Sequence, residues 1–342
     1  MSEPNYKIDS NIKIGIGIAL IVLIGVLSFY SLILGWEIEC QEPDRLITIP
    51  KGASAQSVAI LLKEESCLQN ITIFKLALSL TMKNRSIMPG RYNLKGISSI
   101  GQLVDIITSQ SSDRVRVTLI EGWTLEQFAN ELTNKLEIDS NKFLRLCRDY
   151  NFTHSLGIDA PSLEGFLFPD TYILLKTYME EDVIQILVNQ FYHNMQELKK
   201  ITNEDNINVR EIATMASIIQ GEAMYKDEMS TISSVYHNRL NRKMLLQADP
   251  TIQYITPGKP RRLFDKDLKV DSPYNTYKYK GLPPGPINNP GFEALKAAII
   301  PAETDYLYFV SNGEGRHTFT RTVSEHNEAK KELKQKRRMK KM

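Results

Sequence analysis

One carboxylic acid in an otherwise apolar stretch is the residue whose surroundings most suggest chemistry. The stretch is Ala216-Ser217-Ile218-Ile219-Gln220-Gly221-Glu222-Ala223, and its pattern predicts a buried helix with a single acid, Glu222. Burial raises the pKa of a carboxyl group because a low dielectric constant disfavours its charged form. A carboxylic acid that stays protonated near neutral pH can act as a general acid. The alternative is a surface glutamate at the end of a core helix, the commoner case because acids are seldom buried unpaired.

The composition limits the classes of protein to consider. The chain has 342 residues and a formal net charge of +2 at pH 7. Its length suggests two domains or one elaborate domain. A nearly neutral chain gives no electrostatic reason to expect nucleic acid as a partner. The one basic block, the tail of residues 330–342, is expected to be a solvated helix end or a weak contact with anionic lipid or polymer.

The N-terminal region predicts a membrane anchor. Residues 14–36 carry no charged side chain, and they are long enough to cross a bilayer core of about 30 Å at about 1.5 Å per residue. A cleaved signal peptide would have a shorter apolar region and a small-residue cleavage site. Because Lys7 and Lys13 precede the segment, residues 1–13 are expected in the cytoplasm. We therefore expect a single-pass protein of the cell (inner) membrane with the rest of the chain outside.

Cysteine and histidine usage is sparse. Of the three cysteines, Cys40 and Cys67 could form a bridge in an oxidising compartment, and unpaired or structural thiols are the alternative. The five histidines include His317 and His326, which are too isolated in the sequence to suggest a ligand cluster. We expect neither a metal nor a cofactor.

The first half of the chain contains an internal repeat. Residues 47–54 and residues 117–124 each combine a strand pattern, a Gly turn and a Ser or Thr helix cap before an amphipathic helix pattern. Residues 89–94 favour a turn and a strand between them. Such units resemble the LysM-like modules that touch cell-wall glycan, and residues 45–112 are assigned to a LysM-like module. Packing alone would also explain the pattern.

Two aromatic residues of this region leave the same choice open. Tyr92 and Trp123 could stack on sugar rings, but aromatic side chains at such positions more often fill a core.

The second half changes in character. Residues 162–172 are expected to form an apolar loop, and residues 248–290 a long loop dense in turn residues, which is usually functional in a compact domain. The other expected elements are helices at 181–200, 208–222 and 227–243, a buried strand at 306–310 and a second strand at 317–319. The predicted fold class is α+β, with a transmembrane helix, a small LysM-like α/β subdomain and a larger mixed α+β domain with long loops.

Several motifs in this second half occur in a specific order. They are Leu163-Glu164-Gly165-Phe166-Leu167-Phe168-Pro169-Asp170-Thr171-Tyr172, Ala216-Ser217-Ile218 with Glu222, Asn238-Arg239-Leu240, Leu246-Gln247-Ala248-Asp249-Pro250-Thr251-Ile252-Gln253-Tyr254, Pro273-Tyr274-Asn275-Thr276-Tyr277, and Gly281-Leu282-Pro283-Pro284-Gly285-Pro286-Ile287 with Asn289-Pro290-Gly291. The ordered set closely resembles the endolytic murein transglycosylases, the YceG-like family. The resemblance covers nearly the whole chain.

The resemblance implies a lyase with residues 113–329 as its catalytic domain. Such an enzyme cleaves the β-1,4 bond between N-acetylmuramic acid and N-acetylglucosamine within nascent glycan strands. It leaves a 1,6-anhydro end, consumes no water and ends strand elongation at the membrane. The implied partners are peptidoglycan glycan strands, the plasma membrane and the peptidoglycan synthases.

This reaction fits one acid better than two. A glycoside hydrolase commonly needs two carboxylates about 5 to 9.5 Å apart. A lytic transglycosylase needs one, because the C6 hydroxyl of the sugar is the nucleophile and is held in place by proximity. Glu222 is assigned this role. Many relatives carry a second Glu two positions earlier, where this chain has Gln220, and positions two apart on a helix do not share a face.

The supporting residues are expected from the other motifs. The candidates for substrate binding are Glu164, Gln247, Asp249, Tyr254, Tyr274, Asn275, Thr276 and Tyr277. Their side chains could bond to acetamido and hydroxyl groups or stack on sugar faces. The alternative is that they order a long loop whose backbone would otherwise lack hydrogen bonds. Glu164 is also the best alternative catalytic acid.

Two other functions remain open on the sequence. The first is a membrane-tethered glycan-binding scaffold without catalysis, in which the repeat does the binding and Glu222 is structural. The second is a peptidoglycan hydrolase that uses Glu222 together with Glu164 or Asp249. Reducing ends in the product would identify the hydrolase, whereas a transglycosylase leaves anhydro ends.

Overall fold

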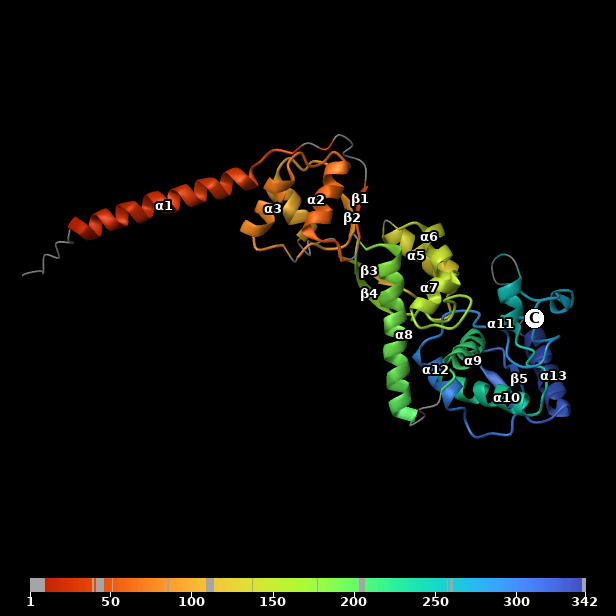
Figure 1. Cartoon of the computed structure of the whole chain (residues 1–342). Helices are drawn as coiled ribbons and strands as arrows, with labels where there is room; N and C mark the ends of the chain where they lie inside the picture. The colour runs from red at the N-terminus through yellow and green to blue at the C-terminus, as the bar shows by residue number, and fades with distance from the viewer. Residues whose placement is uncertain are drawn as a thin grey trace, which may run out of the picture. The chain divides into compact units, whose positions relative to one another are not determined.

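The chain has the mixed α+β composition that the sequence predicts. The structure is a computed structural model that describes residues 10–38, 40, 46–50, 52–84, 86–108, 114–136, 138–176, 178–202, 207–256, 258 and 261–339. These residues form thirteen α-helices and three two-stranded sheets, β1–β2, β3–β4 and β5–β6 (Figure 1). The chain divides into two compact units: unit 1 comprises Met1–Arg114 and Leu175–Met179, and unit 2 comprises Val115–Leu174 and Glu180–Met342.

Unit 1 begins with a long apolar helix, α1 (Ser10–Leu34). Its segment Gly15–Leu34 is apolar enough and long enough to cross a membrane, and most of the large side chains before its last turn are exposed. The helix therefore fits a single-pass membrane anchor. Residues 1–9 of the expected cytoplasmic tail lie outside the described residues.

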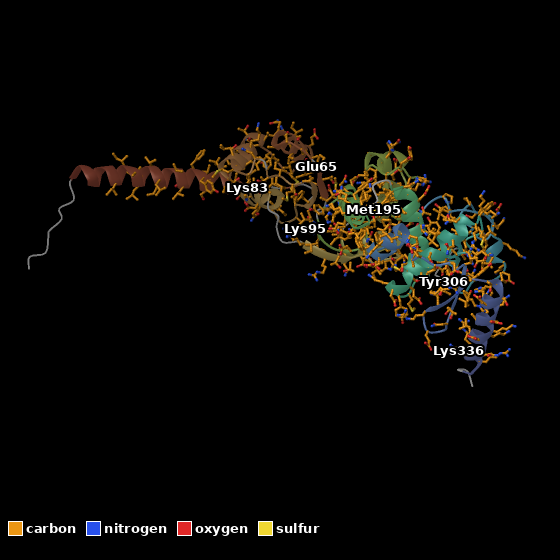
Figure 2. All side chains as sticks on the ribbon, turned by 90° about the horizontal axis from the view of Figure 1, so that it is seen from below. Glu65, Lys83, Lys95, Met195, Tyr306 and Lys336 are labelled. Atoms are coloured by element: carbon orange, nitrogen blue, oxygen red, sulfur yellow. A yellow bond between two sulfur atoms is a disulfide. The ribbon has the colours of Figure 1, made fainter. Side chains whose placement is uncertain are left out.

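The body of unit 1 is a small sheet with helices. Its elements are β1 (Leu46–Ile49), α2 (Ala55–Glu64), α3 (Ile71–Leu80), β2 (Gly90–Asn93) and α4 (Ile100–Thr108). The two strands pair antiparallel, with Ile47 opposite Tyr92. Tyr92 is 4% exposed and its hydroxyl donates to the carbonyl of Met88 at 2.7 Å, so its ring fills the core. Figure 2 labels Glu65, Lys83 and Lys95 on the surface of this unit.

A disulfide closes unit 1 near its membrane helix. Cys40 and Cys67 are bonded to each other, which is the pairing that the sequence allowed. Cys147 of unit 2 is a buried free cysteine, and burial raises the pKa of its thiol.

Unit 2 holds most of the helices. Its elements are β3 (Arg114–Thr118), α5 (Leu125–Lys135), α6 (Ser140–Cys147), α7 (Tyr150–Ser155), β4 (Thr171–Leu175), α8 (Glu180–Thr202), α9 (Val209–Glu222), η1 (Lys226–Glu228), α10 (Met229–Asn241), α11 (Asp249–Ile255), η2 (Asp267–Lys269), α12 (Phe292–Ile299), β5 (Tyr308–Ser311), β6 (His317–Thr320) and α13 (Val323–Met339), with the first residue of β3 and the last residue of β4 assigned to unit 1. The helices expected at 181–200, 208–222 and 227–243 are confirmed within a few residues. The basic residues from 330 to 338 lie on α13 and are exposed, as expected for a solvated helix end.

The internal repeat is also confirmed. In the first copy Ser54 Oγ caps α2 by accepting from Ser57 N at 3.1 Å. In the second copy Thr124 starts α5 in a capping box with Gln127. Gly52 and Gly122 precede the caps with φ of 77° and 81°, a left-handed conformation that suits glycine.

Three expectations about unit 2 need correction. Residues 171–175, which were expected to begin within a loop, form β4, because alternation along this stretch buries Tyr172 and Leu174 on one face. The strand expected to be buried at 306–310 is β5, and it is half-buried along its length. The long loop of residues 248–290 contains the helix α11, whose first turn includes Pro250.

The core of unit 2 surrounds α9. This helix packs against α10, α11 and α12, and every residue from Ala213 to Ile219 is buried. The predicted buried helix is thereby confirmed. Small residues of α12, such as Ala294 and Ala298, allow the two helices to approach closely.

One amide joins three segments that are distant in the sequence. Asn289 is fully buried, and its Oδ1 accepts from the backbone N–H groups of Gly165 at 2.9 Å and Leu167 at 3.2 Å. Its backbone N–H and its Nδ2 both donate to the carbonyl of Trp123, at 2.8 and 3.0 Å, and its own carbonyl accepts from Gly122 at 2.8 Å. The turn before α5, the 162–172 segment and the start of α12 are thus held together.

Glu164 belongs to the same network. The carboxyl group is 3% exposed and accepts from Leu125 N at 3.2 Å and from Asn289 Nδ2 at 3.2 Å. Burial raises the pKa of Glu164 to about 8, and the charge of Glu126 adds to the rise. The Leu125 hydrogen bond and the charge of Arg148 oppose it. This acid therefore holds the start of α5 against the 162–172 segment.

We expect Glu164 to make unfolding pH-dependent. Between the pKa of an unfolded Glu, about 4.3, and the folded value of about 8, the folded protein keeps a proton that the unfolded chain has lost. The free energy of unfolding should therefore fall as pH rises through this interval. Urea unfolding followed by tryptophan fluorescence in detergent should show a shallower fall for Glu164→Gln, which should be the more stable protein above pH 8. Glu131→Gln on α5 is the control, and equal slopes in all three proteins would contradict this assignment.

Candidate active site

An open cavity lies at the end of α9 in unit 2. Its volume is about 1080 Å³. The lining comes from the start of α5, the end of α9, α11 and two loops, and comprises Gly122, Thr124, Glu126, Gln127, Asn130, Gly221, Glu222, Asp249, Pro250, Gln253, Tyr254, Thr256, Gly258, Ile287 and Asn288. A cavity of this size can hold more than one sugar ring, and its lining combines carboxylates, amides and an aromatic ring.

Glu222 is the last residue of α9 and lies in the wall of this cavity. Its side chain is half-buried. Burial raises the pKa of Glu222 to about 7, and the charge of Asp249 adds to the rise. The opposing contributions are a hydrogen bond from Tyr236, one from the backbone of Asp249, and the charge of Arg239. An acid with this pKa is partly protonated at neutral pH, which is the condition for a general acid.

Two residues of α10 stabilise the carboxylate of Glu222, one by a hydrogen bond and one by its charge. The hydroxyl of Tyr236 donates to Glu222 Oε1 at 3.1 Å, and the Tyr236 ring is buried edge-on against Phe309. Arg239 is also buried, and its guanidinium donates to the carbonyls of Leu307 and Leu246, both at 2.7 Å. In the sequence, Arg239 stood out only as part of a family motif, and no role was expected for Tyr236. Tyr236 and Arg239 are three positions apart, which places both on one face of a helix. This spacing is the feature of the sequence that could have identified them as a pair.

A glycine brings α11 against the end of α9. A Cβ atom on Gly221 would lie 2.6 Å from Pro250 Cβ, so no larger residue fits there without movement. This close contact places the start of α11, and with it Asp249, beside Glu222. Gln220 is not part of the cavity wall, since its Oε1 accepts from Gly291 N at 3.1 Å. Positions 220 and 222 thus serve different neighbours, as the helix geometry predicts.

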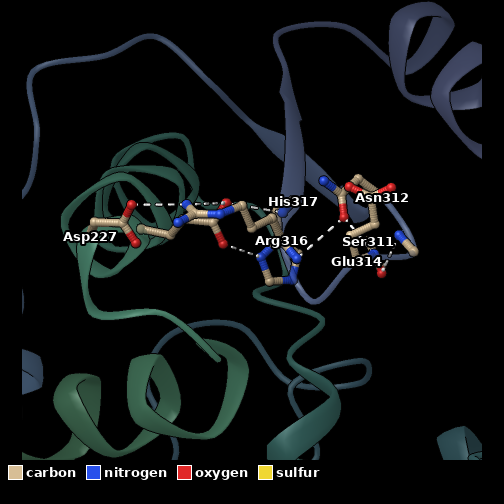
Figure 3. Close-up of polar contacts among 8 residues, drawn as sticks. Asp227, Ser311, Asn312, Glu314, Arg316 and His317 are labelled. Carbon is tan, nitrogen blue, oxygen red and sulfur yellow. Dashed lines mark hydrogen bonds and ion pairs between the residues drawn. The ribbon is translucent and has the colours of Figure 1, made fainter.

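The β5–β6 hairpin holds the segment that follows Glu222. Arg316 pairs with Asp227 at 2.9 Å (Figure 3). His317 Nδ1 lies 3.1 Å from a carboxylate oxygen of Glu228. The guanidinium of Arg316 also lies 4.5 Å from the ring centre of Tyr225. These contacts fix the chain directly after the acid.

Four of the expected substrate residues, Asp249, Tyr254, Tyr274 and Tyr277, line the cavity or contact a residue that lines it. Asp249 and Tyr254 line it. The hydroxyl of Tyr277 donates to Asp249 Oδ1, and the rings of Tyr254 and Tyr274 have their centres 5.2 Å apart. Tyr254 and Tyr274 thus form one aromatic pair at the cavity, and Tyr277 contacts the carboxylate of Asp249.

The other expected residues lie away from the cavity. Asn275 is fully buried, and its Nδ2 donates to the carbonyls of Leu268 and Val270 at 3.0 and 2.7 Å. Thr276 Oγ1, also buried, accepts from Ala248 N at 3.0 Å. Both residues order the long loop, which is the alternative that the sequence left open. The other two, Gln247 and Glu164, are not among the residues that line the cavity.

The sequence missed the contribution of α5 and of Asn288. The α5 side chains that line the cavity are Glu126, Gln127 and Asn130. Asn288 is 6% exposed, its Nδ2 donates to the carbonyl of Ser217 at 2.8 Å, and its Oδ1 is buried without a hydrogen-bond partner among the described residues. Amphipathic periodicity assigns α5 to a surface, but it does not say that this surface faces a cavity.

Comparison with known proteins identifies relatives along most of the chain. A model of the YceG-like family matches residues 47–332. The endolytic murein transglycosylase of Bacillus subtilis (strain 168) is 33% identical over 301 residues, which cover 83% of this chain and 83% of that protein. The endolytic murein transglycosylase of Streptococcus pneumoniae serotype 2 (strain D39 / NCTC 7466) is 27% identical over 314 residues, which cover 82% of this chain and 57% of that protein.

A solved structure agrees with these relatives. The crystal structure of a yceG-like protein from Listeria monocytogenes has a TM-score of 0.58 and 30% sequence identity, and the match covers 83% of this chain and 98% of that one. A family match over residues 47–332 and a relative that is 33% identical over most of its length establish that this chain belongs to the YceG-like family.

Proposed function

We propose that this chain is an endolytic murein transglycosylase, a lyase that cleaves the β-1,4 bond between N-acetylmuramic acid and N-acetylglucosamine within glycan strands. The observation that carries the proposal is a half-buried acid with a pKa of about 7, Glu222, in the wall of an open cavity. Relatives that are similar over most of the chain bear this name.

In the proposed reaction Glu222 acts twice. Its protonated carboxyl group first gives its proton to the glycosidic oxygen, and the bond between that oxygen and the anomeric carbon breaks. The resulting carboxylate then takes the proton of the C6 hydroxyl, whose oxygen bonds to the same carbon and forms the 1,6-anhydro ring. Tyr236 donates to the carboxylate in the intermediate stage. No water enters, and Glu222 recovers its proton.

A second carboxylate in the cavity makes hydrolysis the second candidate. Asp249 lines the cavity beside Glu222 and could activate a water molecule. Its position favours another role. Asp249 Oδ1 accepts from the Tyr277 hydroxyl, and its charge raises the pKa of Glu222. We therefore assign Asp249 to keeping the acid protonated.

The location of the enzyme is part of the proposal. We place residues 1–13 in the cytoplasm, the span of residues 14–36 in the cell (inner) membrane, and the rest outside, where a disulfide such as Cys40–Cys67 is stable. Residues 45–112 would touch glycan as a LysM-like module, residues 113–329 would catalyse, and residues 330–342 would form a basic tail. An enzyme held there can cut nascent strands beside the peptidoglycan synthases and end their elongation.

The first test is the replacement of Glu222. Glu222→Gln keeps the shape of the side chain but removes the transferable proton, and loss of general acid–base catalysis costs about 10²–10⁴ in rate. Mass spectrometry of purified cell-wall glycan digested by the full chain should detect anhydro-ended fragments. The variant should form these fragments at least about a hundredfold more slowly. Glu164→Gln is the matched control and should remain active. Reducing ends instead of anhydro ends would establish the hydrolase.

The second test is the pH profile of kcat/KM. Glu222 must begin protonated, so activity should fall as pH rises through its pKa of about 7. Tyr236→Phe removes a hydrogen bond that stabilises the carboxylate, so the pKa should rise and the falling limb should move to higher pH. Asp249→Asn removes a negative charge, so the limb should move to lower pH. Shifts of the same sign in both variants would contradict these roles.

Asn288 is the residue best placed to accept a hydrogen bond from the glycan. Its Nδ2 points to the carbonyl of Ser217, which fixes the orientation of the amide and leaves Oδ1 buried without a partner at the cavity wall. A buried acceptor without a partner costs about 1–3 kcal/mol. A hydroxyl or an acetamido N–H of the substrate would remove that cost on binding.

We therefore expect Asn288→Ala to weaken substrate binding. The loss of one hydrogen bond of about 1.4 kcal/mol corresponds to about a tenfold higher KM. Asn130→Ala, which removes an exposed amide on α5 from the same cavity, is the control and should change KM little. Thermal unfolding of both variants would verify that each is folded. An unchanged KM for Asn288→Ala would remove Asn288 from the substrate site.

A further inference from the structure

The last turn of α1 is part of the core of unit 1. Ile33 is 5% exposed and Leu34 packs against the same cluster, which contains side chains of α2, α3 and α4. A Cβ atom on Gly101, in the first turn of α4, would lie 2.9 Å from the carbonyl oxygen of Leu34. The end of α1 therefore contacts the sheet-and-helix body of unit 1 directly.

The residues after α1 fix this arrangement. The N–H of Ile100 donates to the carbonyl of Trp36 at 2.9 Å, and the N–H of Ile38 donates to Ser98 at 3.1 Å. The disulfide then ties Cys40 to Cys67. These two hydrogen bonds attach the four residues that follow α1 to the start of α4. The orientation of the rest of unit 1 therefore follows that of α1.

This attachment places one edge of unit 1 at the membrane surface. The 20 residues of Gly15–Leu34 span about 30 Å, the thickness of a bilayer core. Leu34 then lies where the hydrocarbon ends, and Gly101 beside it lies at the level of the headgroups. Trp36 is 41% exposed at the same level, where tryptophan is favoured.

An exposed apolar residue lies at this edge. Met82 follows α3, is 90% exposed and has a φ of 56°, in the left-handed region that favours glycine after a helix. Its neighbour Lys83 lies at the end of unit 1 where α1 enters in Figure 2, whereas Glu65 and Lys95 lie toward the far end. A large apolar side chain in a glycine-like position, surrounded by water, contributes nothing to the fold.

We propose that this edge of unit 1, formed by Trp36, Met82 and Lys83, is a membrane-docking surface. Its partner is the bilayer that α1 crosses, and the inference rests on α1 being a membrane span. Met82 inserts at the boundary between headgroups and acyl chains, where its side chain leaves water. Lys83, which pairs with Asp105 at 2.6 Å, lies at the headgroups. Unit 1 thus lies on the membrane surface.

Fluorescence quenching in vesicles tests the docking. The full chain is reconstituted in phosphatidylcholine–phosphatidylglycerol vesicles with a nitrobenzoxadiazole label on Met82→Cys, on Lys95→Cys as the far-side control, or on Leu27→Cys within α1. The native cysteines leave the new thiol as the accessible one, because Cys147 is buried and Cys40 is bonded to Cys67. Nitroxide-labelled lipids and aqueous iodide are the two quenchers.

The three labels distinguish the outcomes. We expect shallow nitroxide lipids to quench the Met82 label at least about twofold more than the Lys95 label, and iodide to show the reverse order. A Met82 label that behaves like the Lys95 label, while lipid quenches the Leu27 label, would overturn the docking surface and leave the anchor intact. A Leu27 label that lipid does not quench would overturn the anchor and, with it, the docking surface. Neither result bears on Glu222.

Discussion

The geometry of unit 2 depends on one buried amide. Asn289 lies just before α12 and forms hydrogen bonds both with the turn before α5 and with the segment that carries Glu164. A buried donor or acceptor that loses its partner costs about 1–3 kcal/mol. Since Asn289 satisfies several such groups in one place, the wall formed by α5 and the wall formed by α9 and Asn288 are held by a single set of hydrogen bonds.

Opposite influences on the pKa of Glu222 are balanced, as its proposed role requires. Burial and Asp249 raise the pKa of Glu222, while Tyr236 and Arg239 lower it, and the result lies near neutral pH. A group that must give a proton and then take one needs such an intermediate pKa. Glu164 shows the contrast. It is more deeply buried and bonded to Leu125 and Asn289, so its carboxyl group joins two segments of unit 2.

The end of α1 shares a core with the rest of unit 1. Ile33 of α1 is buried in the same cluster as Leu103 of α4, and Gly101 allows the two helices to touch. In the proposed membrane location, a span that shares a core with the rest of unit 1 would fix the height and orientation of that unit above the bilayer. A flexible linker would fix neither.

The sequence by itself determined the local features: the apolar span, the caps at Ser54 and Thr124, the buried helix ending at Glu222 and the family motifs. These depend on neighbours within a few positions, which periodicity and capping record. Only the tertiary structure decided which polar residues face the cavity. Asn275 and Thr276 support a loop, whereas Tyr236 reaches the acid and Asn288 the cavity wall. Those roles depend on contacts between segments far apart in the chain, and no local pattern encodes them.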